Sequence, residues 1–83
     1  MPALNEFEYP IYYLEILKRL NEPKGIRQLE KETGLNYHKI YNALKNLEID
    51  GIVSRRDAGK EKLYYLTEKG YELLRKLRVI LVE

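Results

Sequence analysis

The chain has 83 residues, enough for one small domain with a modest core, and its net charge of +2 does not by itself indicate a nucleic-acid partner. It has no cysteine, one histidine (His38) and aspartate only at positions 50 and 57; this excludes thiolate or multi-histidine metal sites and a histidine-based catalytic triad, so we expect no enzyme, metal or cofactor. No apolar stretch approaches the roughly 20 residues of a membrane span, and no signal-peptide pattern occurs, so a soluble, cytoplasmic protein without a membrane partner is expected.

The first predicted element is a helix over about residues 10–21, because Pro10 suits a first turn that has no use for its missing N–H. Four apolar residues at helical spacing are predicted to face the core: Ile11, Leu14, Leu17 and Leu20. Four others add apolar area outside that stripe: Tyr9, Tyr12, Tyr13 and Ile16. Residues 21–25 contain proline and glycine and are predicted to break the helix.

A second helix of two turns is predicted over residues 26–33, with Ile26 and Leu29 pointing inward. Its polar residues are interpreted as a solvent-exposed face, with contact of Arg27 and Gln28 with backbone phosphate as the alternative: Arg27, Gln28 and Lys31. Gly34 can adopt positive φ and end this helix, and Leu35 fills the elbow that follows.

A third helix is predicted over residues 36–49, starting at a cap formed by Asn36 and stopping at Asp50-Gly51. One apolar stripe would face the core: Ile40, Leu44 and Leu47. The opposite side carries imidazole, hydroxyl, amide and ammonium groups: His38, Tyr41, Asn42 and Lys45. Such groups suit a helix that reads base edges and holds phosphates.

Each of these polar residues also has a structural reading. His38 is either a nucleic-acid contact, which its position favours, or an ordinary exposed residue. Asn36 is a cap first and a contact second, whereas Asn42 has no capping role and is a candidate for a bidentate bond to adenine. Tyr37 lies nearer the core side, so partial burial fits it as well as a contact with sugar or phosphate.

A β-hairpin is predicted next, with a strand over 52–56, a turn over 57–60 and a returning strand over 61–66. Strand alternation puts Tyr64 and Leu66 on one face, and Leu63 and Tyr65 on the other. Four cations surround the turn: Arg55, Arg56, Lys60 and Lys62. Residues 24–62 hold nine basic and six acidic groups, so the basic excess of the chain lies here and on the third helix.

The last predicted helix covers residues 68–82, with Thr67 as its cap. Its apolar stripe consists of Leu73, Leu74, Leu77, Ile80 and Leu81. The run at 79–82 is apolar nearly all round, and Tyr9, Tyr12 and Ile16 add a similar excess on the first helix. Such patches predict a two-fold homodimer that packs through its first and last helices, unless the apolar C-terminus is merely frayed.

The order helix, helix, helix, strand, strand, helix defines a mainly α fold with a small β-hairpin (α+β). Two segments, 33–53 and 65–70, resemble the winged-helix transcription regulators, particularly the MarR-like and PadR-like groups and their small archaeal relatives. The resemblance covers about residues 10–78 within a single domain, 1–83. It implies that the third helix enters the major groove and that the hairpin, the wing of these families, lies on the backbone or in the minor groove.

The function expected from the residues and the resemblance together is sequence-specific binding of double-stranded DNA by a transcription regulator, with repression as the simpler outcome. The predicted DNA contacts are Asn36, Tyr37, His38, Lys39, Tyr41, Asn42, Lys45, Arg55, Arg56, Lys60 and Lys62. The alternative is a winged helix used for protein–protein assembly, which the near-neutral charge and the many tyrosines also fit. The sequence is compatible with a small-molecule effector but does not indicate one.

Overall fold

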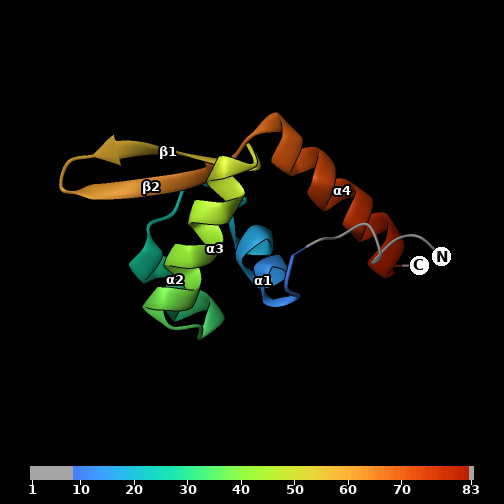
Figure 1. Ribbon diagram of the computed structural model, residues 1–83, viewed down its shortest axis with the longest axis horizontal. Helices are drawn as coiled ribbons and strands as arrows, with labels where there is room; N and C mark the ends of the chain where they lie inside the picture. The colour runs from blue at the N-terminus through green and yellow to red at the C-terminus, as the bar shows by residue number, and fades with distance from the viewer. Residues whose placement is uncertain (1–8, 83) are drawn as a thin grey trace.

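The computed structural model describes the backbone of residues 9–82 and the side chains of residues 9–77. Its elements are α1 (Tyr12–Arg19), α2 (Ile26–Thr33), α3 (Tyr37–Ile49), β1 (Val53–Ala58), β2 (Glu61–Leu66) and α4 (Glu68–Val82). The β1–β2 hairpin projects from one side of the three-helix body and α4 projects from the other (Figure 1). The architecture is the winged helix, as predicted. None of the helices described has the length and hydropathy needed to cross a membrane.

The core is built around α3, whose Ile40, Leu44 and Leu47 are completely buried. Leu29 of α2 is equally buried, and the roots of the two strands contribute Val53 and Leu66. The predicted apolar stripe of α3 is therefore confirmed. The predicted alternation in β2 is also confirmed, because Tyr64 and Leu66 are buried while Leu63 and Tyr65 are only partly covered.

The first helix differs from its prediction. It starts at Tyr12 and ends at Arg19, and Ile11, which precedes it, is 63% exposed instead of buried. The buried stripe is Tyr13, Ile16, Leu17 and Leu20, joined by Leu14. It follows the same i, i+3, i+4, i+7 rule with a different starting residue. Tyr13 and Ile16 are thus core, and it was wrong to place them outside the core stripe.

Tyrosine rings join the start of the described chain to this core. The ring of Tyr9 stacks on Tyr13 with 5.2 Å between centroids, and Tyr12 meets Tyr13 edge-on at 5.1 Å. The Tyr13 hydroxyl accepts a hydrogen bond from the Asn46 side chain of α3 at 2.9 Å. Tyr9 and Tyr12 are partly buried against the core, so less of this apolar excess remains for a partner than the sequence suggested.

The first strand differs from its prediction at both ends: β1 starts at Val53 instead of residue 52, and it continues through Asp57 and Ala58, which leaves a turn of only two residues. Gly59 has φ 68°, a conformation that glycine adopts without the steric cost of a side chain. The backbone of Lys24 adds an isolated bridge to β2: its N–H donates to the Tyr64 carbonyl at 3.0 Å, and its carbonyl accepts from the Tyr64 N–H at 2.8 Å.

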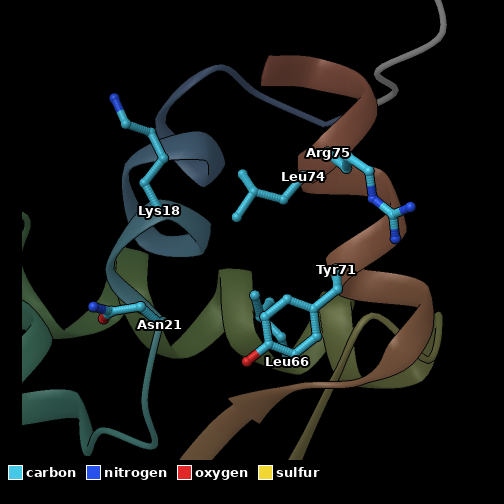
Figure 2. A pocket seen from close by; sticks show the side chains of 6 residues that line it. All are labelled: Lys18, Asn21, Leu66, Tyr71, Leu74 and Arg75. Carbon is cyan, nitrogen blue, oxygen red and sulfur yellow. The ribbon is translucent and has the colours of Figure 1, made fainter. Parts of the chain in front are cut away.

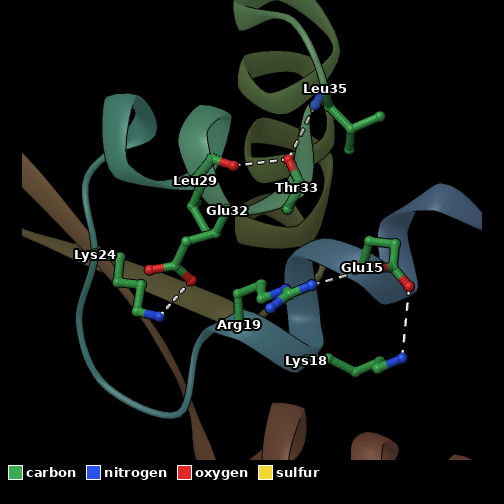
Figure 3. A network of polar contacts seen from close by, with 8 residues as sticks. All are labelled: Glu15, Lys18, Arg19, Lys24, Leu29, Glu32, Thr33 and Leu35. Atoms are coloured by element: carbon green, nitrogen blue, oxygen red, sulfur yellow. Dashed lines mark hydrogen bonds and ion pairs between the residues drawn. The ribbon is translucent and has the colours of Figure 1, made fainter.

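The side chain of Lys24 is fixed as well (Figure 3). Its ammonium lies 2.7 Å from a carboxylate oxygen of Glu32, whose other oxygen accepts from the Gln28 amide at 2.7 Å. The pKa of Glu32 is lowered by the hydrogen bond from Gln28 first and by Lys24 second. This contact ties the loop before α2 to the last turn of that helix.

The start of α4 is clamped onto the end of α3. Thr67 Oγ1 accepts from the Gly70 N–H at 3.2 Å, as its predicted capping role requires, and donates to the carbonyls of Gly51 (2.6 Å) and Ile52 (3.0 Å). Lys69 Nζ donates to the Asp50 carbonyl at 3.0 Å. Gly70 packs so closely that an added Cβ would lie 2.3 Å from the Ile52 carbonyl oxygen. We call these contacts of Thr67, Lys69 and Gly70 the α3–α4 clamp.

Leu73, Leu74 and Leu77 of the predicted α4 stripe are partly or fully buried. The side chains of Ile80 and Leu81, and the apolar run at 79–82, lie outside the side chains that the structure describes.

Candidate nucleic-acid interface

The turn before α3 forms as the residue types predict. Gly34 adopts φ 77° and its N–H donates to the Glu30 carbonyl at 2.9 Å, which closes α2. Thr33 Oγ1 donates to the Leu29 carbonyl at 2.7 Å and accepts from the Leu35 N–H at 3.1 Å (Figure 3). Asn36 Oδ1 accepts from the Lys39 N–H at 2.9 Å, so the predicted cap of α3 is confirmed.

Removal of this cap gives a first testable prediction. Asn36→Ala leaves the Lys39 N–H without its acceptor and should lower the free energy of unfolding by about 1 kcal/mol. In a domain of this size the melting temperature should fall by roughly 4–8 °C. Asn36→Asp keeps an acceptor oxygen and is the matched control. Equal melting temperatures for the alanine and aspartate variants would contradict the capping role.

The outer face of α3 is exposed along its whole length. It comprises Tyr37, His38, Lys39, Tyr41, Asn42 and Lys45. Tyr37 is 46% exposed, so its side chain is partly covered and still open to a partner. Lys39 lies at the α1 edge of this face, with Nζ 5.2 Å from the centroid of the Tyr12 ring. Polar and aromatic groups therefore cover one side of a helix whose other side is fully buried.

The wing carries its cations on two faces. The strands pair Val53 with Leu66, Arg55 with Tyr64, and Asp57 with Lys62. Because side chains alternate between the two faces along each strand, Arg55 and Lys62 lie on the face that carries the buried Tyr64. Arg56 pairs with Leu63 on the opposite face. There it lines a separate hollow of about 480 Å³ with Tyr65, Tyr71 and Asn21. The structure thus separates the two arginines that the sequence grouped together at the turn.

A hollow of about 480 Å³ lies between α2, α3 and the inner face of the wing, and we call it the α3–wing hollow. It is lined by Ile26, Arg27, Tyr37, Tyr41, Arg55, Lys60, Glu61, Lys62 and Tyr64. Five of the predicted contact residues meet there: Tyr37, Tyr41, Arg55, Lys60 and Lys62. Arg27, which the sequence placed on a solvent face, joins them, and no sequence signal showed that the wing would lie beside it.

Arg55 is held in place at the root of the wing. Its Nε lies 3.3 Å from a carboxylate oxygen of Glu48 on α3. The pKa of Arg55 is raised by its hydrogen bond with Tyr64 first and by the charge of Glu48 next. Arg55 therefore remains a cation at any physiological pH, and part of its charge is already neutralised by Glu48. Among the residues that the structure describes, Arg27, Lys60 and Lys62 form no ion pair.

A second hollow of about 510 Å³ lies between α1 and α4, on the other side of the body (Figure 2). It is lined by Lys18, Asn21, Leu66, Tyr71, Leu74 and Arg75. None of the predicted contact residues lies in it. Within the described part of the chain, no three histidine, cysteine, aspartate or glutamate side chains gather as metal ligands.

A family model described as winged helix-turn-helix matches residues 9–82, nearly the whole chain. The chain belongs to this family. Subunit STN1 of the CST complex from Rattus norvegicus is 37% identical over 57 residues, which are 68% of this chain and 14% of that protein. The chain therefore spans about a seventh of the length of this curated relative.

Several solved structures share the fold. A G34K mutant of MepR from S. aureus superimposes with a TM-score of 0.88 at 20% identity, over 95% of this chain and 63% of the other. The PcaV transcriptional regulator of Streptomyces coelicolor gives 0.84 at 21% identity, over 90% and 57%. A MarR family transcription regulator, SP03579, gives 0.84 at 20% identity, over 96% and 56%. The chain spans less than two thirds of each.

Proposed function

We propose that this chain is a cytoplasmic transcription regulator that binds double-stranded DNA with sequence specificity. Helix α3 would enter the major groove and the wing would lie along the backbone or in the minor groove. The observation that carries the proposal is the exposed outer face of α3 beside Lys60 and Lys62 of the wing, which form no ion pair among the described residues. Asn42 and His38 present hydrogen-bonding groups for base edges, while Lys45, Lys60 and Lys62 present charges for phosphates.

The names of similar structures support the regulatory part of the proposal. PcaV is named a transcriptional regulator, and SP03579 a MarR family transcription regulator. Repression is the outcome we favour, because occupying a promoter requires no further contact surface. PcaV was solved with its natural ligand, and the hollow between α1 and α4 would be the place to seek an effector of this chain.

A homodimer would place two copies of α3 about 34 Å apart, facing successive major grooves of a near-palindromic site. The proposed interface uses the first and last helices. Ile11 before α1 (63% exposed) and Tyr71 on α4 (49% exposed) support it, as does the apolar sequence of 79–82. Sedimentation at tens of micromolar protein tests the dimer, and a monomer there would overturn it.

A second candidate is a protein–protein assembly module. The STN1 likeness favours it, because that relative is named as a subunit of a complex. The two functions differ in their response to salt. DNA binding through phosphates weakens steeply with rising salt, whereas an assembly module shows little DNA affinity even at low salt.

The proposed function is tested by fluorescence anisotropy with a random-sequence duplex at about 50 to 200 mM salt, followed by selection of a preferred site. Asn42→Ala should then lose about 1–3 kcal/mol at one base position and relax specificity there. Glu68→Ala, an exposed change outside the interface, is the control. An Asn42→Ala protein that binds every sequence as the parent does would show that α3 does not read bases.

Glu48 should limit DNA affinity, because its carboxylate neutralises Arg55 beside the α3 face. Glu48→Gln should bind the random duplex about two- to fivefold more tightly at low salt, as expected for release of an exposed ion pair. Glu72→Gln on α4 makes the same charge change away from the interface and should have no effect. Equal affinities of Glu48→Gln and the parent would mean that Arg55 does not contact DNA.

A further inference from the structure

The α3–wing hollow contains a pair of parallel aromatic rings, Tyr37 and Tyr41. The rings of Tyr37 and Tyr41 lie parallel within 6°, with 6.2 Å between centroids. Both side chains are exposed, at 46% and 41%, and both line the hollow. His38 meets Tyr37 edge-on at 6.4 Å. Exposed parallel rings beside cations are the arrangement on which proteins stack unpaired bases.

The charges around this pair fit a nucleic-acid backbone. Arg27, Lys60 and Lys62 line the hollow with no ion pair among the described residues, and Arg55 adds a fourth cation. Glu61 is the one acidic residue among those that line it. Its carboxylate lies against Gly25 at the start of α2, where a Cβ on Gly25 would be 2.6 Å from Oε1. Four cations therefore line the hollow with a single carboxylate, that of Glu61, which lies against the start of α2.

The size of the hollow fits a single nucleotide. Its volume of about 480 Å³ lies within the range of roughly 300–1,000 Å³ that holds small organic ligands. A base-paired duplex is too wide to enter a space of this volume and would lie across its mouth. A single unpaired base with its sugar and phosphate can enter, place its ring on the tyrosines and leave its phosphate near the cations.

We propose that the α3–wing hollow binds a single-stranded segment of DNA, with a base stacked on the Tyr37–Tyr41 pair and the flanking phosphates held by Arg27, Lys60 and Lys62. This inference rests on the proposed DNA binding and makes it more specific. The preferred substrate is a duplex that continues into an unpaired strand. Helix α3 contacts the duplex while the hollow receives the strand that leaves it.

The test compares a blunt duplex with the same duplex carrying an extension of eight thymidines, by fluorescence anisotropy at fixed salt. The extension should tighten binding by at least about fivefold, as expected for stacking of one base. The double variant Tyr37→Ala/Tyr41→Ala should bind both DNAs more weakly and with equal affinity, so that the extension gives no gain. Tyr37→Phe/Tyr41→Phe keeps the ring faces and should bind the extended duplex more tightly than the blunt one, as the parent does. Glu68→Ala, an exposed change outside the hollow, should leave the gain from the extension unchanged.

Each outcome is decisive. If the extension gives no gain while the blunt duplex is bound with a steep salt dependence, the inference is overturned and the proposed function stands. If the gain survives in the double alanine variant, the unpaired strand binds elsewhere and the inference is also overturned. If neither DNA is bound at the lowest salt, the proposed function itself fails.

Discussion

Gly70→Ala should destabilise the protein more than any other single change considered above. The added Cβ would lie 2.3 Å from the Ile52 carbonyl oxygen, a backbone atom that also accepts hydrogen bonds from Thr67 N (3.1 Å) and Oγ1 (3.0 Å). The α3–α4 clamp must open to relieve this contact. Overpacking of this kind costs about 2 kcal/mol, although alanine by itself is the better helix former.

The measurement is thermal unfolding followed by circular dichroism. A loss of about 2 kcal/mol should lower the melting temperature by roughly 8–16 °C in a domain of this size. Glu72→Ala, an exposed change in the same helix, is the control and should unfold close to the parent. If Gly70→Ala had the same melting temperature as the control, the close approach of α4 to residue 52 would be disproved.

The second large effect is expected at the wing tip. Lys60→Ala/Lys62→Ala removes two exposed cations that form no ion pair among the described residues. If each contacts one phosphate, the slope of log affinity against log salt should become shallower by about 1.8, and affinity at low salt should fall about tenfold. All sequences should be affected alike, because phosphates carry no sequence information.

The salt series that tests this prediction includes Lys31→Ala/Lys76→Ala, which removes two exposed cations of α2 and α4 that form no ion pair among the described residues. That control should keep the parental slope. A wing variant with the parental slope would show that the wing does not touch the backbone, and DNA contact would then be confined to α3.

The parts of the fold that the sequence predicted correctly depend on local signals. Gly34 adopts positive φ and Asn36 accepts a hydrogen bond from a backbone N–H three residues later, so their residue types alone indicated the turn and the cap. The stripe of α3 was long enough to fix its buried face. Helix α1 has only eight residues, and Leu17 and Leu20 fit two overlapping stripes. The spacing therefore fits two stripes equally well. One contains Ile11 and Leu14, and the other contains Tyr13 and Ile16.

Contacts between distant segments were beyond the reach of sequence patterns. The bridge between Lys24 and Tyr64 joins backbone groups, which any residue type carries. The presence of Arg27 in the α3–wing hollow depends on where the wing packs, and that is a tertiary property. The separation of Arg55 from Arg56, in contrast, follows from strand alternation and was available in the sequence. Whether the predicted contact residues touch DNA stays a prediction.

The bridge between Lys24 and Tyr64 divides the wing into two parts of unequal stability. Burial falls from Val53 and Leu66 at the base to exposed residues at 57–62, and the bridge fastens only the base. Amide hydrogens near Tyr64 should therefore exchange with solvent only through large-scale opening, while those near Gly59 exchange through local fraying. If the wing contacts DNA, its fixed base and movable tip would let Lys60 and Lys62 follow phosphates whose positions vary, while Arg55 would keep a constant position relative to α3.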